Sequence, residues 1–237
     1  MIATPEAVRE HLNQGDIEIT GRLVDASNAT LFGTCTYKDR AIDVIYKPIA
    51  GERPLWDFPD GNLASREYAS HLISELAQWN IVPMTVLRNG PFGEGMVQQW
   101  IDIDDSVDLA EFYRTDDVRL RQIALFDVVI NNTDRKIGHL LPTTEGHVYG
   151  CDHGVTFHCD FKLRTVLWQW AGKQLRSDEI STLQDLLGKI RVRQDLFGDL
   201  ISTYEYQALI TRIEGLLSEG VFPSPSEDWP AIPWPPF

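Results

Sequence analysis

Hydrophobic and polar residues alternate with a period of two over much of residues 17–48, as in half-buried β-strands. Short polar turns interrupt the alternation at 25–29 and 38–40. Pro48 ends the last run, because proline cannot donate a hydrogen bond to a β-ladder. The pattern predicts a three-stranded antiparallel meander. Its strands are expected at residues 17–23, 30–37 and 41–48, with two further strands at residues 82–87 and 95–101.

Apolar residues at helical spacing predict two helices in the first half of the chain. A short one begins after Thr4, a suitable N-cap, has Pro5 in its first position and ends at Gly15. A longer one follows Asn62 and places its apolar residues over 63–76. Further elements are expected in the second half: helices at 118–131, 178–188, 193–200 and 204–219, and short strands near 138–142 and 147–151.

Together these elements predict an α+β protein. A sheet of about five strands and one long helix occupy the first part of the chain, and the second part is mostly helical. The last segment, 222–237, contains six prolines and two tryptophans. We expect it to form an extended tail that packs on the body of the molecule.

Charge and composition exclude several classes of protein. The 237 residues carry a formal net charge of −14, from 35 acidic and 21 basic residues, which argues against nonspecific binding to nucleic acid or anionic lipid. An anionic ligand in a local basic pocket stays possible. No apolar run approaches the ~20 residues of a membrane span, and the N-terminus lacks the features of a secretory signal. The three cysteines have no metal-ligand spacing, which is typical of reduced thiols in a cytoplasmic protein.

Lys47 and Glu67 are the first candidate functional residues. Lys47 ends an apolar strand, where the sheet would hold its ammonium group as a fixed charge suited to phosphate. Glu67 lies on the long helix, from which its carboxylate could hold Lys47 by an ion pair. Either residue alone is more typical of a solvated surface. Arg66 beside Glu67 further weakens the functional interpretation of Glu67.

The run Asn131–His139 (NNTDRKIGH) follows the apolar helix of the second half and is dense in polar groups. Loops held by a rigid scaffold often contain catalytic residues. Asp134 can accept a proton or orient a hydroxyl group, and Arg135 can pair with a carboxylate or a phosphate. Asn132 and His139 are candidate polar or metal-site residues. A helix-terminal turn capped by Asn and Asp is the alternative interpretation.

Two more segments complete the pattern. Gln98, Gln99 and Trp100 lie where a strand leads into the connection between the two halves, and their backbone groups could meet an adenine edge. Asp152 follows an apolar strand and precedes Gly154 by two residues, so a turn there could direct its carboxylate towards Mg²⁺. Lysine on a strand, glutamate on the next helix, a connecting strand, Asp-Arg after a helix and then Asp-X-Gly is the order of parts in protein-kinase-like phosphotransferases.

With these residues the chain resembles the atypical kinase superfamily that includes the phosphatidylinositol 3- and 4-kinases, especially the type II 4-kinases, and the HipA-like bacterial kinases. It is most similar to an uncharacterised family of small bacterial proteins resembling phosphatidylinositol 3/4-kinases. The resemblance covers roughly residues 17–215. Four runs show it: 44–59 (VIYKPIAGERPLWDFP), 91–100 (PFGEGMVQQW), 131–141 (NNTDRKIGHLL) and 151–158 (CDHGVTFH).

The resemblance implies a bilobal protein-kinase-like fold and a set of roles. The N-lobe, residues 1–101, would hold an antiparallel sheet and the long helix, and the C-lobe, residues 102–221, the catalytic loop, the metal-binding aspartate and most helices, before the tail at 222–237. The implied nucleotide-binding residues are the phosphate contact Lys47, its anchor Glu67, the phosphate-covering turn Ser27, Asn28 and Ala29, and the adenine-pocket residues Gln98, Gln99 and Trp100. Asp134, with Arg135 beside it, would be the catalytic aspartate, and Asp152 the main Mg²⁺ ligand.

His139 departs from the pattern, since it stands where the lipid kinases place a metal-binding asparagine. A neutral imidazole suits Mn²⁺ or Zn²⁺ better than Mg²⁺. Lys136 also departs, because the lipid kinases have a histidine after the Asp-Arg pair. The chain leaves little room for a lipid-recognition lobe, which together with its negative charge argues against a phosphoinositide substrate.

We therefore expect an ATP- and Mg²⁺-dependent phosphotransferase, with Mn²⁺ possible, whose acceptor is an unknown protein or small molecule. Three alternatives stay open: a nucleotide-binding pseudokinase, an enzyme that transfers AMP, and a metal-dependent hydrolase. The hydrolase would use a cluster of carboxylates and imidazoles from Asp134, His139, Asp152, His153 and His158. The oligomeric state is also open.

Overall fold

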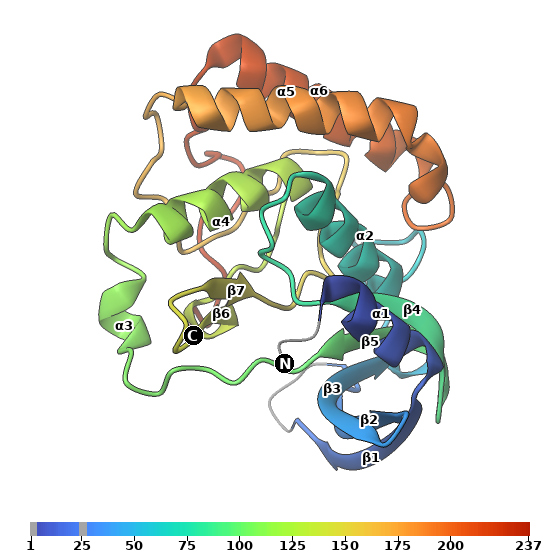
Figure 1. Cartoon of the computed structure of the whole chain (residues 1–237). Helices are drawn as coiled ribbons and strands as arrows, with labels where there is room; N and C mark the ends of the chain where they lie inside the picture. The colour runs from blue at the N-terminus through green and yellow to red at the C-terminus, as the bar shows by residue number, and fades with distance from the viewer. Residues whose placement is uncertain (1–3, 24–27) are drawn as a thin grey trace.

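The computed structural model of the chain describes residues 4–23 and 28–237 (Figure 1). Five antiparallel strands form one sheet in the order β1-β2-β3-β5-β4. Their bounds are β1 Asp16–Arg22, β2 Leu31–Tyr37, β3 Arg40–Pro48, β4 Thr85–Gly90 and β5 Gly93–Gln99. The predicted meander and the two later strands are confirmed, the latter displaced by two or three residues.

Strand β3 is central and has two different faces. Val44 and Tyr46 are fully buried and belong to a small core with Leu12 and other residues of the sheet half. Ile45 and Lys47 alternate with them along the strand and therefore lie on the opposite face. That face looks towards the helical half of the molecule, so the sheet presents Lys47 to the space between the halves.

Helix α1 (Pro5–Gln14) covers the other face of the sheet, as the contacts of α1 with β2, β4 and β5 show. Its predicted start is confirmed, because the Thr4 hydroxyl accepts a hydrogen bond from the backbone N–H of Ala7. It ends at Gly15, as predicted.

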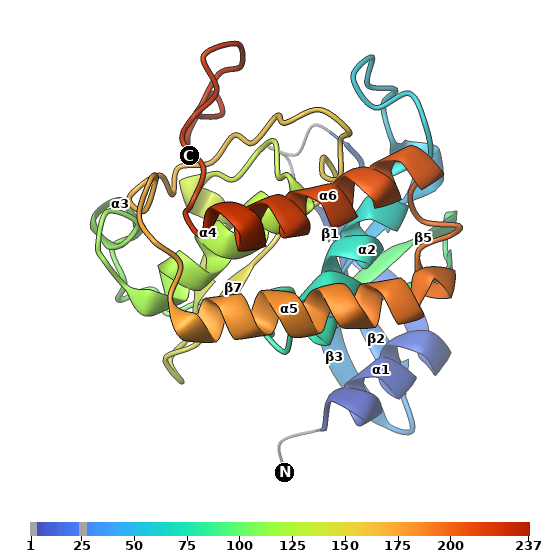
Figure 2. The same ribbon diagram turned by 90° about the horizontal axis from the view of Figure 1, so that it is seen from above.

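Helix α2 (Leu63–Leu76) connects the two halves (Figures 1 and 2). The side chain of Asn62 caps it by accepting from Ser65 N–H. Leu72 and Ile73 are buried in the large core of the helical half, and the helix also contacts strands β4 and β5. A helix buried on nearly all sides cannot turn without breaking this core, so the direction of Glu67 is fixed.

The helical half is built around α4. Its helices are α3 Leu109–Phe112, α4 Val118–Ile130, α5 Ser177–Val192 and α6 Thr203–Glu219. Between α4 and α5 lie a short helical turn, η2 Ile137–His139, and a two-stranded sheet, β6 Leu140–Pro142 with β7 Val148–Gly150. Helices α5 and α6 lie over α4 in Figure 1, so its apolar residues face core in most directions.

The helix predicted at 193–200 is wrong. The segment forms only the short turn η3 Gln194–Leu196 and further turns. Gly198 lowers its helix propensity, and Phe197 and Leu200 are both buried, so the core favours a compact turn over a solvent-facing helix.

The tail, residues 222–237, lies along the helical half, as expected. The carbonyl of Ala231 accepts hydrogen bonds from Thr165 N–H at 3.0 Å and from the Trp168 indole at 2.9 Å. The carbonyl of Pro236 accepts from Ile137 N–H at 2.8 Å. Among the described residues, no helix has the length and apolar character needed to cross a membrane.

Candidate functional site

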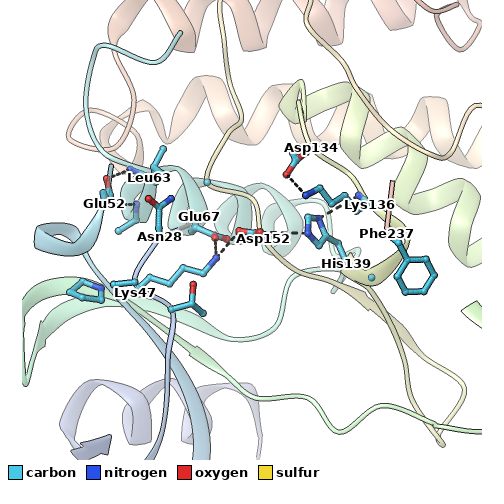
Figure 3. Close-up of a pocket in the computed structure, with 16 residues that line it drawn as sticks. Asn28, Lys47, Glu52, Leu63, Glu67, Asp134, Lys136, His139, Asp152 and Phe237 are labelled. Carbon is cyan, nitrogen blue, oxygen red and sulfur yellow. Dashed lines mark hydrogen bonds and ion pairs between the residues drawn. The ribbon is translucent and has the colours of Figure 1, made fainter. Parts of the chain in front are cut away.

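A polar cavity of about 300 Å³ lies between the sheet and the helical half (Figure 3). Its walls come from segments far apart in the sequence: the turn at 28–30, the end of β3, the start of α2, the loop 134–139 and residues 152–154, together with Phe237. Three of the residues expected to act together, Lys47, Asp134 and Asp152, line this one cavity.

Lys47 is held by two carboxylates. Its Nζ donates to Glu67 Oε1 at 2.6 Å and to Asp152 Oδ1 at 2.7 Å. The second oxygen of Glu67 accepts the backbone N–H of His153 at 2.8 Å. Burial opposes the charge on Lys47, but the charges of Asp152 and Glu67 raise its pKa well above the ordinary value. The cation in turn holds the pKa of Asp152 well below its usual range, so both groups are ionised at neutral pH.

Asp134 faces the same cavity from the loop that follows α4. Burial, together with the nearby charge of Asp152, raises the pKa of Asp134 to about 6. Lys136 partly offsets this effect, with its Nζ at 3.6 Å from Asp134 Oδ2. The side chain is therefore ionised at neutral pH and is a stronger base than an ordinary aspartate.

His139 lies beside Asp152, with Nε2 at 3.5 Å from Asp152 Oδ2. Burial lowers the pKa of His139 to about 4, so the imidazole is neutral at neutral pH. Among the described residues, no group of three or more His, Cys, Asp or Glu side chains is arranged to hold a metal ion. Mg²⁺ commonly uses only one or two carboxylates together with substrate phosphates, and Asp152, which lines the cavity, fits that requirement.

Arg135 does not line the cavity. Its guanidinium is fully buried and donates to both carboxylate oxygens of Asp127, at 2.9 to 3.2 Å. It also donates to the carbonyl of Cys151 at 3.1 Å and to His153 Nε2 at 2.6 Å. The sequence suggested a partner carboxylate or a phosphate, and the partner in this fold is Asp127. In this position Arg135 fixes the loop of Asp134 against the segment of Asp152 and does not reach the cavity.

Asn132 completes this buried network. Its amide donates to Asp127 at 2.9 Å, and its carbonyl oxygen accepts the backbone N–H of Asp134 at 3.0 Å. The Thr165 hydroxyl donates to the same Asp127 at 3.2 Å. Sequence reasoning missed Asp127, although an acidic residue within the apolar run LFDVV of α4 was a signal that it has a buried partner.

Asp152 has a left-handed backbone conformation, with φ at 61°. This conformation is uncommon for residues other than glycine, although aspartate tolerates it better than most. Gly154 serves a different purpose from the turn flexibility expected. A Cβ atom at Gly154 would lie 3.2 Å from Cβ of Leu63 and 3.8 Å from Oε1 of Glu67. Glycine there lets the segment approach α2 closely enough for Asp152 and Glu67 to share Lys47.

A second cavity, of about 490 Å³, adjoins the first, and the two have Lys47, His139 and Asp152 among their shared walls. Its other walls are mostly apolar, as an adenine site requires. Gln98, Gln99 and Trp100 line this cavity, although the Gln98 amide donates to the Thr85 hydroxyl. Further apolar walls come from Ile45, Ile101, Ile103 and Leu141.

The turn expected to cover phosphates is only partly described. Ser27 lies outside the described residues, whereas Asn28 and Ala29 line the polar cavity. Asn28 Oδ1 accepts the backbone N–H of Arg53 at 2.9 Å, and Ala29 N–H donates to the carbonyl of Gly51 at 3.3 Å. The loop after β3 therefore holds this side of the turn.

Glu52 and Arg66 are functional candidates that sequence reasoning missed or discounted. The carboxylate of Glu52 lines the cavity and accepts the backbone N–H groups of Leu63 and Ala64, both at 2.8 Å. These are two of the N–H groups at the start of α2 that have no partner within the helix. Arg66 is buried and pairs with Glu205 of α6 at 2.6 Å, which fastens α2 to the helical half next to Glu67.

The five residues of the hydrolase alternative do not converge. His153 is fully buried against Arg135, and His158 lies near Asp57 with its Nε2 at 3.8 Å from Oδ1. Neither side chain lines the cavity that contains Asp134, His139 and Asp152. The geometry gives the hydrolase reading no support.

Comparison with known proteins identifies a relative by sequence. No family model matches the chain. A Mycobacterium tuberculosis protein, Rv2133c, is 42% identical over 264 aligned positions, which cover 95% of this chain and 94% of that protein.

Two solved structures are also similar. A Golgi casein kinase has a TM-score of 0.57 at 15% identity, covering 91% of this chain and 74% of its own. The Helicobacter pylori proinflammatory kinase CtkA has a TM-score of 0.47 at 13% identity, covering 89% and 94%. The first of these likenesses shows the fold, so the expected α+β, kinase-like fold is confirmed.

Proposed function

The chain belongs to the family of the Mycobacterium tuberculosis protein Rv2133c, and from its kinase-like fold we propose that it transfers a phosphoryl group from ATP to an acceptor hydroxyl. The observation that carries this proposal is the position of Lys47, shared between Glu67 and Asp152 in a cavity that also contains Asp134. A fixed cation and two separate carboxylates around one polar space are what a triphosphate and its metal require.

The two adjoining cavities account for the two ends of ATP. The apolar cavity lined by Gln99 and Trp100 would take the base, and the polar cavity the phosphates. Lys47 lies on both and would contact the phosphates near their middle. The turn of Ser27, Asn28 and Ala29 would cover the phosphates from the sheet side.

Asp134 would orient the acceptor hydroxyl and receive its proton, for which a pKa of about 6 is suitable. The bond from the γ-phosphorus to its bridging oxygen breaks, a bond from phosphorus to the acceptor oxygen forms, and ADP leaves. Lys136 and Lys47 place positive charge near the transferred group from opposite sides of the cavity.

Asp152, together with the phosphates, would hold the divalent cation, which would supply neutralisation of phosphate charge when bound. Its carboxylate fits Mg²⁺, and the neutral imidazole of His139 within reach makes Mn²⁺ a suitable substitute. Lys47 contacts Oδ1 of Asp152, which leaves Oδ2, at 3.5 Å from His139 Nε2, to face the cation. We also propose that the chain is related to the phosphatidylinositol 3/4-kinase-like proteins. Its proposed lobes are residues 1–101 and 102–221, followed by a tail at 222–237.

The test uses ATP labelled on the γ- or the α-phosphate. We expect transfer of the γ label only, and a loss of about 100-fold or more in kcat for Asp134→Asn with little change in ATP binding. Transfer of the α label would indicate AMP transfer instead. ATP binding without transfer of either label would indicate a pseudokinase, and full activity of Asp134→Asn would contradict the role of Asp134.

A further inference from the structure

Two segments far apart in the sequence both contact the segment 158–162. These are the loop 52–61, between β3 and α2, and the tail, residues 222–237. In Figure 2 both project to the same side of the molecule, the loop in cyan and the tail in red. Lys162 forms an ion pair with Asp57 of the loop, so the loop is fastened at the point where the segments meet.

Aromatic contacts extend this meeting point. The Nζ of Lys162 lies 4.8 Å from the centroid of the Trp229 ring in the tail and 5.7 Å from that of Trp56 in the loop. The Phe58 ring meets the His158 ring edge-on at 5.5 Å. Cation–π and edge contacts of this kind hold rings in place without burying them completely.

Both segments also reach the polar cavity. Glu52, at the start of the loop, and Phe237, in the tail, line the cavity together with Asp134. The Phe237 ring stands next to Gly138, and the bond from Ile137 N–H to the Pro236 carbonyl holds it there. The two segments therefore form part of the wall of the cavity into which an acceptor must bring its hydroxyl.

The side chains that the two segments expose are unusually large and apolar. We call Trp56, Ile232, Trp234 and Phe237 the aromatic rim; their exposed fractions are 85%, 52%, 86% and 63%. Single exposed apolar residues are ordinary, but four on the two segments that line one cavity indicate a surface that binds a partner. A small acceptor inside the cavity could contact Phe237, but Trp56, Ile232 and Trp234 do not line the cavity.

The charges near the rim are mainly negative. The exposed acidic residues of the three segments are Asp60, Asp160, Glu227 and Asp228, and the exposed basic residue is Arg53. Among the described residues, the four acids have no Lys or Arg ion-pair partner. Such a surface attracts a cationic partner and repels anionic lipid or a second copy of a chain with a net charge of −14.

We propose that the aromatic rim is the docking surface for the acceptor, and that the acceptor is a polypeptide segment with basic and apolar side chains around its hydroxyl residue. This inference rests on the proposed phosphotransfer and adds the class of its acceptor. The apolar side chains lie against Trp56 and Trp234, the basic ones near Asp160 and Asp228, and the hydroxyl points past Phe237 towards Asp134.

The test measures docking without nucleotide, by fluorescence anisotropy of the full-length chain with two labelled peptide pools of equal length. Both pools have a central serine and mixed Leu, Phe and Ala; one adds Lys and Arg, the other Asp and Glu. We expect binding of the basic pool, weakened by salt, and a loss of about 10-fold in affinity for the double variant Trp56→Ala/Trp234→Ala. Phe92→Ala, which removes another exposed ring from the β4–β5 turn, is the control and should bind as the wild type does.

Several outcomes would overturn the proposal: equal binding of the acidic pool, unchanged affinity of the double variant, or no binding of the basic pool. Binding of phosphatidylserine vesicles, or a dimer in sedimentation that the double variant loses, would assign the rim to a membrane or to a second copy. A pool that docks but receives no γ-phosphate contradicts the proposed function and leaves the docking surface intact. Transfer to other hydroxyl groups without docking would contradict only the role of the aromatic rim as the docking surface.

Discussion

The loop of Asp134, on the helical side of the cleft, is fastened by side chains without access to solvent, whereas the sheet side is fastened by a few bonds at the edge of the cavity. On the helical side, Asp127, Asn132 and Arg135 are fully buried and joined in one network. On the sheet side, the turn at 28–30 is held by bonds to the loop at 51–53.

The difference separates two tasks. In the proposed phosphotransfer Asp134 would act on the transition state, and such a group works best when its position needs no adjustment during the reaction, as the network around Asp127 allows. The proposed nucleotide must enter and leave, so the part that would cover it has to open. Lys47 stands between the two, since it belongs to the sheet but is held by carboxylates of α2 and of the 152–154 segment.

The largest effect is expected from breaking the buried network. Asp127→Asn leaves the guanidinium of Arg135 buried without its counter-charge, which should lower the free energy of unfolding by about 3–5 kcal/mol. Urea unfolding measures this. Asp117→Asn, on the same helix, is the matched control, because Asp117 pairs with Arg119 nearer the surface and asparagine also caps a helix. Asp117→Asn should lower the free energy of unfolding by less than about 1 kcal/mol. Equal losses for the two variants would mean that the buried network stabilises the protein no more than a pair near the surface.

Lys47→Met tests the residue between the two sides. Loss of a charged contact to phosphate should weaken ATP binding by about 1.5–3 kcal/mol, which is roughly 10- to 150-fold. Calorimetric titration with ATP and Mg²⁺ gives the value. Lys38→Met, in the β2–β3 turn, removes a surface lysine paired with Glu10 and should leave ATP affinity unchanged. Unchanged affinity of Lys47→Met would mean that the phosphates lie elsewhere.

Asp134 should show opposite effects on activity and stability. The pKa of Asp134 in the folded protein, about 6, lies above the ordinary aspartate value of 3.8 that applies to the unfolded chain. The folded state therefore favours the protonated form. The associated stability is present below about pH 4 and is lost as the pH rises through 6. At pH 7.5, Asp134→Asn should therefore raise the free energy of unfolding, by about 1–2 kcal/mol after allowance for partial exposure.

Activity should follow the ionised form of Asp134, so kcat of the wild type should fall as the pH drops below about 6. The stability gain of Asp134→Asn should vanish near pH 4. If that variant were less stable than the wild type at pH 7.5, the carboxylate would have a stabilising partner that this geometry lacks.

The smallest effect is expected from Glu52, on the adjustable side. Glu52→Gln weakens the bonds to the first N–H groups of α2 and should cost about 0.5–1 kcal/mol, as helix caps do. The apparent affinity for ATP should drop by no more than about fivefold, with kcat nearly unchanged. Thermal unfolding and a KM-against-kcat comparison measure both. Glu94→Gln, on an exposed part of β5, serves as the control, and a larger loss in kcat than in affinity would place Glu52 among the rigid elements.

The sequence predicted the elements better than the partnerships between them. Lys47 at a strand end and Asp152 before a glycine were readable from local patterns. In the sequence, Arg66 only weakens the functional interpretation of Glu67, yet Arg66 is buried and anchors α2 through Glu205. The helix expected at 193–200 failed because the core, rather than local propensity, determined that segment.

What the chain determined by itself was the alternation that forms the sheet, the apolar helices and the order of the charged residues along them. These features depend on the conformational preferences of neighbouring residues and on hydrophobic periodicity, both of which can be read directly from a sequence. The tertiary structure decided which carboxylate pairs with which cation: Asp127 pairs with Arg135, and Glu67 and Asp152 both pair with Lys47. A buried charge must be paired wherever folding brings a partner, and that partner lay 8, 20 or 105 residues away along the chain.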